Sequence, residues 1–324
     1  MTRIGWRVLL AAALLLPLSA ALAGGPKYQP RIAGPWQPLF RPEKAGNYLN
    51  DHCLYQDPKG DWHLVGITAL HSPRFGTGEY WFAHGVTSSL TTPMRELDPL
   101  FKGWPDNHQK WAPHALWAGD TLHLFAGPGA IRHFSSRDGY QFEYVGIAMQ
   151  NDYRFLRDTM VLKLDGGGFV LYATDLVDGK DSISAWRSKD LDSWTYYGVV
   201  FTAVKPASVW APLPSSACES PFVVKRDDGY YLSMTLTNQV RSTYIKSPVF
   251  FSEDPLNFGV YAAGGKGETA RYVTTYAAHA PEIVKDGDKW WITTAGWPGF
   301  PRPEGCPDHL ACIAPLEWKT AGGQ

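Results

Sequence analysis

Three acidic residues recur at the same place in a segment that this chain repeats five times. The repeats begin at Asp51, Trp111, Asp158, Glu219 and His279, roughly 47 to 61 residues apart, which is a period typical of propeller repeats. Aligned without gaps, each repeat has a glycine-containing turn after the first strand and an aliphatic residue thirteen positions on. Equivalent positions of a closed ring meet at its axis, so we expect the three acids to share one funnel. Such a cluster is the acid/base apparatus of a hydrolase.

Ring order suggests a role for each acid. Asp51 in the first repeat would stand across the funnel from Glu219 in the fourth, and Asp158 would lie beside Glu219. Glycoside hydrolysis needs a carboxylic acid to protonate the leaving oxygen and a carboxylate opposite it. Repulsion from Asp158 would raise the pKa of Glu219 and keep it protonated near neutral pH. One such acid alone would more often be solvated or cap a turn, but three in one register favour catalysis.

Four neighbouring residues are candidates for substrate binding. Arg157 could keep Asp158 ionised, clamp a sugar hydroxyl, or only neutralise the funnel, while Trp111 could stack on a sugar ring with His114 nearby. His279 could touch substrate or hold a water or a calcium ion at the axis, and a structural histidine is an equal alternative. We expect no required cofactor, and no cysteine spacing indicates zinc.

The elements that position these residues are predicted to be strands. In the fourth repeat, two β-rich runs flank the hairpin sequence Asp227-Asp-Gly229. Helical periodicity is nearly absent after the first 23 residues. Four strands in each of five copies account for almost all of residues 24–324, which predicts an all-β, five-bladed β-propeller in one domain. Residues 24–50 would lead into the ring and are candidates for the strand that closes it.

A second recurrent pattern consists of Ser-x-Asp with an aromatic residue four positions after the aspartate. We expect the serine and aspartate to cap a turn and the aromatic ring to anchor the outer strand. The pattern occurs in three repeats, at Ser136–Asp138 with Phe142, Ser188–Asp190 with Trp194, and Ser252–Asp254 with Phe258.

The first 23 residues resemble a signal peptide. Arg3 and Arg7 precede an apolar run at 8–18, and Ala21-Leu-Ala23 suits a signal peptidase. The run is too short to span a bilayer comfortably. We therefore predict an exported protein, periplasmic or secreted, that is not inserted in the membrane. In that compartment Cys306 and Cys312 could form a local disulfide, while Cys53 and Cys218 could pair or remain free thiols.

Composition narrows the range of partners. The net charge is −1 and the basic residues are scattered, which argues against nucleic acid or an anionic membrane surface as partner. Aromatic residues make up 14% of the chain, with 14 Trp, and this excess suits either sugar stacking or the packing between propeller blades. We expect a monomer that binds an oligosaccharide or polysaccharide.

These residues resemble those of the five-bladed propeller glycoside hydrolases of families 43, 32, 68 and 117, over nearly the whole of residues 24–324. Asn50-Asp51 is similar to the first-blade motif with the catalytic Asp, Arg157-Asp158 to the Arg-Asp pair whose Asp stabilises the transition state, and Glu219-Ser-Pro-Phe to the family-43 Glu-Gly-Pro-Phe segment with the general acid. His279-Ala-Pro-Glu282 also recurs in family-43-like chains. Family 32 has Asn-Asp-Pro-Asn-Gly where this chain has Asn-Asp-His-Cys-Leu, so family 43 is preferred.

The resemblance implies an exported glycosidase that degrades carbohydrate. Its substrate would be a terminal arabinofuranoside, xyloside or fructoside. Inversion through an activated water is preferred for Asp51, with a nucleophilic role as the alternative. A non-catalytic, lectin-like propeller is the rival hypothesis, since fold alone supports both. A sialidase-like hydrolase is less favoured, because it would need another blade count and an arginine cluster.

Overall fold

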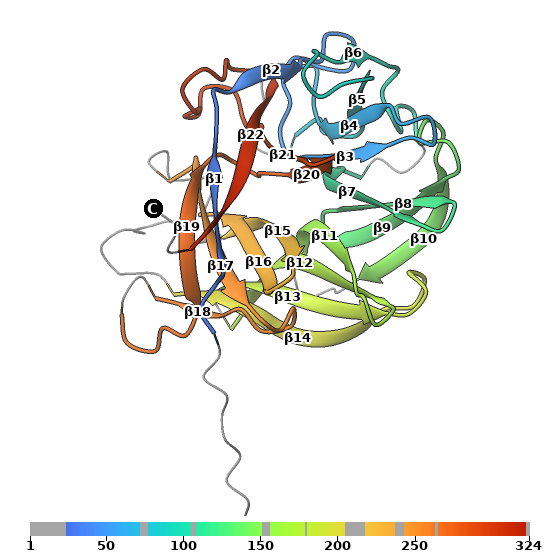
Figure 1. Ribbon diagram of the computed structural model, residues 1–324. Coiled ribbons are helices and arrows are strands. Elements are labelled where there is room, and N and C mark those ends of the chain that lie inside the picture. The colour runs from blue at the N-terminus through green and yellow to red at the C-terminus, as the bar shows by residue number, and fades with distance from the viewer. Residues whose placement is uncertain are drawn as a thin grey trace, which may run out of the picture.

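Five sheets, antiparallel except for one short strand, form a ring around a central axis in the computed structural model (Figure 1). The structure describes residues 24–71, 77–104, 108–150, 156–178, 180–204, 218–236, 243–262 and 265–321. Within these ranges the chain has no helix, and so none that is long and apolar enough to cross a membrane. The predicted five-bladed β-propeller is confirmed. The predicted signal peptide, residues 1–23, lies outside the described residues.

The blades follow one another along the chain, and each runs outward from its innermost strand. Blade 1 contains β3 (His52–Gln56), β4 (Trp62–Ile67), β5 (Phe82–Thr87) and β6 (Arg95–Glu96). Blade 2 contains β7 (Trp111–Ala118), β8 (Thr121–Gly127), β9 (Ala130–Ser136) and β10 (Glu143–Gln150). Blade 3 contains β11 (Arg157–Lys163), β12 (Phe169–Val177), β13 (Lys180–Ser188) and β14 (Thr195–Ala203).

The last two blades depart from four strands in chain order. Blade 4 contains β15 (Glu219–Arg226), β16 (Gly229–Thr235), β17 (Lys246–Ser252) and β19 (Arg271–Ala277). The short β18 (Gly259–Tyr261), which precedes β19, instead pairs in parallel with β14 and adds a fifth strand to blade 3. Blade 5 contains β20 (Ile283–Asp286), β21 (Lys289–Thr294) and β22 (Ala311–Thr320).

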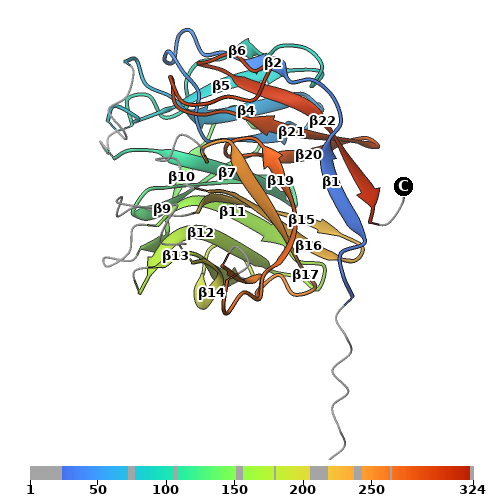
Figure 2. The ribbon, with the colours of Figure 1, turned by 90° about the vertical axis from the view of Figure 1, so that its left-hand side faces the viewer.

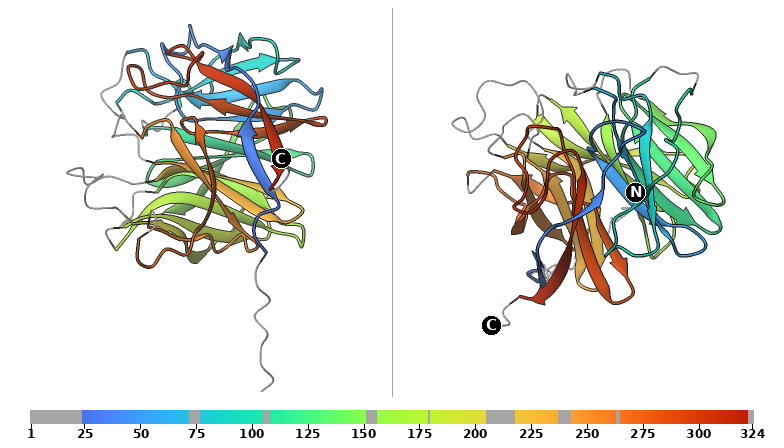
Figure 3. Two further views of the ribbon diagram at one scale, coloured as in Figure 1. Left: turned by 60° about the vertical axis from the view of Figure 1, so that its left-hand side comes forward. Right: turned by 90° about the horizontal axis from the view of Figure 1, so that it is seen from above.

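The N-terminal segment completes blade 5, as expected of a closing strand. Strand β1 (Tyr28–Ile32) pairs antiparallel with β22, and β2 (Gln37–Phe40) pairs with the beginning of β22. The blue first strand and the red last strand lie side by side in Figure 2 and in both views of Figure 3. The first and last described strands therefore hold the ring together.

The repeated aliphatic residues form the interior of the blades. All five are fully buried on the second strand of their blades: Leu64, Leu124, Leu171, Leu232 and Ile292. The Ser-x-Asp turns are also formed as expected, since Ser136 Oγ accepts from Gly139 N at 2.9 Å and Asp138 Oδ1 accepts from Tyr140 N at 2.8 Å. The turn at Ser188 has the same pattern.

The cysteines divide into one bridge and two free thiols. Cys306 and Cys312 form the local disulfide that their spacing allowed. Cys53 and Cys218 are buried and free.

Candidate active site

The innermost strands β3, β7, β11, β15 and β20 bring the repeated positions together at the axis. A cavity of about 20 Å³ there is lined by residues from all five blades: Asp51, His52, Ala112, Pro113, Asp158, Thr159, Ser220, Pro221, Ala280 and Glu282. Ser220 contacts both Asp51 and Asp158, and Arg157 contacts both Asp158 and Glu219. The three predicted acids therefore lie in one cluster.

The ungapped alignment of the repeats places the first residues of blades 1 and 3 one position out of register with those of blades 2, 4 and 5. Counted from the paired residues of the first two strands, Asp51 and Asp158 correspond to Ser220, whereas Glu219 corresponds to Arg157. Backbone geometry agrees, because Ala112, Asp158, Ser220 and Ala280 all have positive φ, between 41° and 55°. In blades 2, 3 and 4 a register shift, typical of a β-bulge, follows the first residue of the innermost strand.

Turn length explains why this offset was not apparent. Leu54 and its partner Leu64 are ten residues apart, as are Val161 and Leu171. The corresponding partners in blade 4, Val223 and Leu232, are nine residues apart. The extra residue in the turns of blades 1 and 3 cancels the one-residue offset at the beginning of the strand, so the aliphatic positions still align.

Asp51 is held by two polar side chains. Its Oδ2 accepts a 2.7 Å hydrogen bond from Ser220 Oγ, and its Oδ1 lies 3.3 Å from His279 Nε2. Burial alone would raise the pKa of Asp51, but hydrogen bonding and charge at His279 and the Ser220 hydroxyl lower it below its ordinary value. Asp51 is therefore the acid of the cluster most readily ionised.

Asp158 lies in a more crowded environment. Its Oδ2 accepts from Thr174 Oγ1 at 3.0 Å and from Ser220 N at 3.3 Å, and it is 3.3 Å from Arg157 Nε. Burial and the charge of Asp51 raise the pKa of Asp158 to about 6, against the opposing effect of Arg157. Arg157 thus contacts Asp158 and favours its ionised form, as one of the suggested roles requires, but burial outweighs the guanidinium.

Glu219 is the most strongly perturbed of the three. Its side chain is nearly inaccessible, and its Oε2 lies 3.5 Å from Arg157 Nη2. Burial raises the pKa of Glu219 well above its usual value, and Asp158 and Asp51 add to this despite Arg157. Like-charge repulsion contributes as the sequence suggested, but burial is the larger cause. Glu219 and Asp51 thus have pKa values displaced in opposite directions.

The predicted substrate-binding residues occupy different environments. Trp111 is half-buried against the core of blades 1 and 2. His114 is buried, and its Nε2 lies 3.2 Å from the Val161 carbonyl of the next blade. His279 is also buried, stacked on Tyr244 with ring centroids 3.9 Å apart. It contacts Asp51 rather than lying open to a ligand.

Two further carboxyl groups near the cluster were missed. Glu79 is fully buried, and burial raises its pKa to about 8 against hydrogen bonds from Tyr48 and Trp111. Glu282 lines the axial cavity, and burial, with Asp51, raises its pKa well above the usual value. The His279-Ala-Pro-Glu282 sequence was noticed, but Glu282 was not assigned a role. Glu79 precedes β5 outside any repeated position, so periodicity could not have found it.

Among the described residues, no group of three or more His, Cys, Asp and Glu side chains could hold a metal ion. At the axial position suggested for calcium, His279 Nε2 lies 3.3 Å from Asp51 Oδ1.

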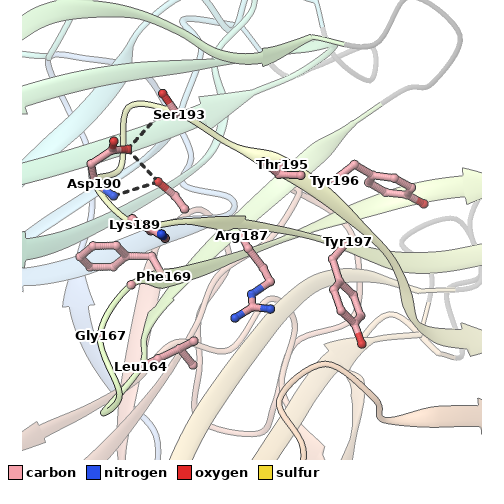
Figure 4. Close-up of a pocket in the computed structure, with 12 residues that line it drawn as sticks. Leu164, Gly167, Phe169, Arg187, Lys189, Asp190, Ser193, Thr195, Tyr196 and Tyr197 are labelled. Carbon is pink, nitrogen blue, oxygen red and sulfur yellow. Dashed lines mark hydrogen bonds between the residues drawn. The ribbon is translucent and has the colours of Figure 1, made fainter.

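A larger open groove lies away from the acids, on the outer part of blade 3 (Figure 4). It has a volume of about 620 Å³ and lies between the turn before β12 and the turn between β13 and β14. Arg187 and Tyr197 face it, and Asp190 on its rim is engaged in hydrogen bonds to its own turn. None of the clustered acids lines this groove.

Solved structures of glycoside hydrolases share this fold. A thermostable family-43 glycoside hydrolase superposes with a TM-score of 0.60 at 15% identity, over 87% of this chain and 97% of that chain. The α-L-arabinanase of Cellvibrio cellulosa, solved with arabinohexaose, superposes with a TM-score of 0.58 at 14% identity, over 84% of this chain and 91% of the arabinanase chain. Sucrose-6-phosphate hydrolase from Lactobacillus gasseri superposes with a TM-score of 0.60 at 15% identity, over 87% of this chain and 61% of the hydrolase chain. No protein-family model and no curated protein matches the sequence.

Proposed function

We propose that this protein is a glycoside hydrolase. The observation that carries the proposal is the axial cluster in which Asp51 has a lowered pKa and Glu219 a raised one. Two carboxyl groups whose environments push their pKa values apart are what acid/base catalysis requires. The similarity in fold to furanoside-cleaving enzymes agrees with this, although fold alone does not determine function.

In the proposed mechanism Glu219 is the general acid. It enters the reaction protonated, because burial disfavours its ionised form, and gives its proton to the leaving glycosidic oxygen. Asp51 enters ionised, takes a proton from a water molecule and directs that water to the anomeric carbon. Asp158, next to Arg157, would stabilise positive charge on the sugar ring in the transition state.

The proposed substrate is an oligosaccharide or polysaccharide with a terminal furanoside or a related glycoside, such as an arabinofuranoside, xyloside or fructoside. The fold neighbours are named for arabinan and for sucrose 6-phosphate, which favours a furanose at the cleaved bond. We propose inversion of configuration and, from the N-terminal 23 residues, action outside the cytoplasm.

The test is hydrolysis of a panel of nitrophenyl glycosides. We expect Asp51→Asn and Glu219→Gln each to lower turnover about 10²- to 10⁴-fold, since each removes a group that transfers a proton. Asp120→Asn, an exposed residue paired with Arg137, is the control and should leave turnover unchanged. NMR of the first anomer released would distinguish inversion from retention.

The lectin-like alternative predicts a different result in the same panel. Oligosaccharides would bind without product, and Asp51→Asn would not change the reaction because there would be none. Turnover that survives in Asp51→Asn or Glu219→Gln at the wild-type level would contradict the assigned roles.

A further inference from the structure

We infer that Ser220 is a positioning residue for Asp51, held in a strained backbone conformation so that its hydroxyl fixes which oxygen of Asp51 is engaged. The inference rests on the proposed function, because its significance depends on Asp51 as the base. It concerns a residue that the repeat analysis passed over, since Ser220 was noted only as the neighbour of Glu219.

The backbone at Ser220 is unfavourable for serine. Its φ is 53°, in the left-handed region that glycine adopts freely and that costs other residues on the order of 1 kcal/mol or more. Pro221 follows and restricts Ser220 further. Glycine would relieve this strain, so a side chain at this position needs a compensating interaction.

The compensating interaction is a pair of hydrogen bonds to two different acids. Ser220 Oγ donates to Asp51 Oδ2 at 2.7 Å, and Ser220 N donates to Asp158 Oδ2 at 3.3 Å. The positive φ turns the backbone N–H of Ser220 toward blade 3 while its side chain reaches blade 1. Ser220 of blade 4 therefore connects Asp51 of blade 1, across the axis, with Asp158 of the neighbouring blade 3.

This arrangement makes the two oxygens of Asp51 inequivalent. Oδ2 is engaged by the Ser220 hydroxyl, whereas Oδ1 faces His279 Nε2 at 3.3 Å. Because Oδ2 already accepts the Ser220 hydrogen bond, we expect Oδ1 to be the oxygen that takes up the proton in the proposed reaction.

The Ser220 hydroxyl also favours the ionised form of Asp51 in surroundings that largely oppose it. Burial disfavours the charge, and most of the neighbouring ionisable groups are acidic. The ionisable groups that affect or are affected by Asp51 come from every blade around it except the second: His52, Glu79, Asp158, Glu219, Tyr244, His279 and Glu282. Of these, only the two histidines can carry positive charge. Without the hydroxyl, Asp51 should take up a proton at higher pH.

The experiment compares Ser220→Ala with Ser220→Gly. Both variants lack the hydroxyl, but only glycine also relieves the backbone strain. We expect the acidic limb of the kcat/KM profile on an aryl glycoside to move up by about one pH unit in both variants, the effect of losing one hydrogen bond to a charged group. We expect Ser220→Gly to unfold at a temperature about 2 to 4 °C above Ser220→Ala.

Ser184→Ala is the matched control. Ser184 Oγ donates to the buried Asp175 Oδ2 at 2.6 Å, outside the acid cluster, so its loss should lower stability without moving the pH profile. A wild-type pH profile in both Ser220 variants would overturn the inference, even if their stability changed, because it would leave Ser220 with a structural role alone.

A second readout separates this inference from the proposed function. Carboxyl ¹³C NMR titration measures the pKa of Asp51 without any turnover. If no glycoside is hydrolysed by the wild-type protein, the proposed function fails, while a rise in the Asp51 pKa in both Ser220 variants would still support the hydrogen-bonding role. An unchanged Asp51 pKa would contradict it.

Discussion

At the scale of single residues, Glu79 makes stability depend on pH. It is fully buried, and Tyr48 OH donates to its Oε1 at 2.7 Å. Burial raises its pKa to about 8, so the folded protein keeps this proton through a range in which the unfolded chain releases it. The native state then binds more protons than the unfolded state between about pH 4.5 and 8, and the stability contributed by Glu79 falls as pH rises through that window.

Glu79→Gln should remove this dependence. Glutamine keeps an acceptor for the Tyr48 hydroxyl but does not ionise. Relative to wild type, we expect the variant to gain on the order of 2 kcal/mol in free energy of unfolding between pH 5 and pH 8, measured by urea denaturation. Wild-type and variant curves that stay parallel across this range would mean that Glu79 is already ionised in the folded protein.

At the scale of elements, blades 1 and 2 each contain a pair of histidines in contact, fully buried in blade 1 and partly buried in blade 2. His63 Nδ1 lies 2.8 Å from His84 Nε2, and His123 Nδ1 lies 2.7 Å from His133 Nε2. The pairs are equivalent, because His63 and His123 each precede the repeated leucine, and their partners occupy the same place on the third strand. One ring nitrogen of each pair must donate and the other accept, so both rings can be neutral.

Protonation of such a pair should destabilise its blade. Burial, together with the neighbouring histidine, lowers the pKa of His84 to about 3 and that of His133 to about 4. The unfolded chain takes up protons below about pH 6.5, whereas the folded pairs stay neutral. Their contribution is therefore complete above pH 6.5 and decreases as pH falls toward 4.

His133→Phe tests this in blade 2. Phenylalanine retains the stacking on Phe125, whose ring centroid is 4.5 Å away. We expect the variant to lose about 1 kcal/mol at pH 7.5, for the hydrogen bond to His123, but to lose less stability than wild type between pH 6.5 and 4.5. Phe125→Leu is the control: Phe125 contacts His133 but does not titrate, so this substitution should lower stability equally at pH 6.5 and at pH 4.5. A wild-type slope in His133→Phe would refute the role of the pair.

The repeated strands and turns also show how much of the fold and of the acid cluster could be predicted from the sequence. The period, the glycine-containing turns and the buried aliphatic positions predicted five blades, because burial repeats whenever the same supersecondary unit is packed around an axis. The same regularity located Asp51, Asp158 and Glu219 in one cluster. Its limit is the hairpin turn after the innermost strand, which is one residue longer in blades 1 and 3 and so hides the one-residue offset at the beginning of the strand.

Residues outside the repeat could not be found in this way. Tyr48 lies in the connection before β3 and Glu79 in the connection before β5, and the two side chains share a hydrogen bond. His114 lies three positions after Trp111 on the same strand, and its ring contacts the backbone of blade 3. The next residues toward the axial end, Ala112 and Pro113, line the cavity instead.

At the scale of the whole molecule, the ring depends on a strand from the other end of the chain. Strand β1 pairs with β22 from Tyr28–Thr320 to Ile32–Leu316. Tyr28 also contributes to a cluster around the Arg226 guanidinium, which lies 4.5 Å from the Tyr28 ring and 5.1 Å from the Trp318 ring. Blade 5 therefore gains its outer strand, and blade 4 an aromatic contact, from residues that are distant in sequence.

Deletion of residues 24–33 should open this closure. It removes the β1 ladder and the Tyr28 face of the Arg226 cluster, and it exposes the edge of β22, for a loss on the order of 3 kcal/mol and a fall in Tm of about 6 to 10 °C. Arg31→Ala is the control, because the Arg31–Glu317 pair is half exposed and contributes little. Differential scanning calorimetry of both variants measures the effect. Since the three acids lie on or next to innermost strands that the deletion leaves intact, the proposed glycosidase activity should be retained below the new Tm. Equal Tm values for the deletion and Arg31→Ala would show that the ring is closed by the other contacts of blade 5 alone.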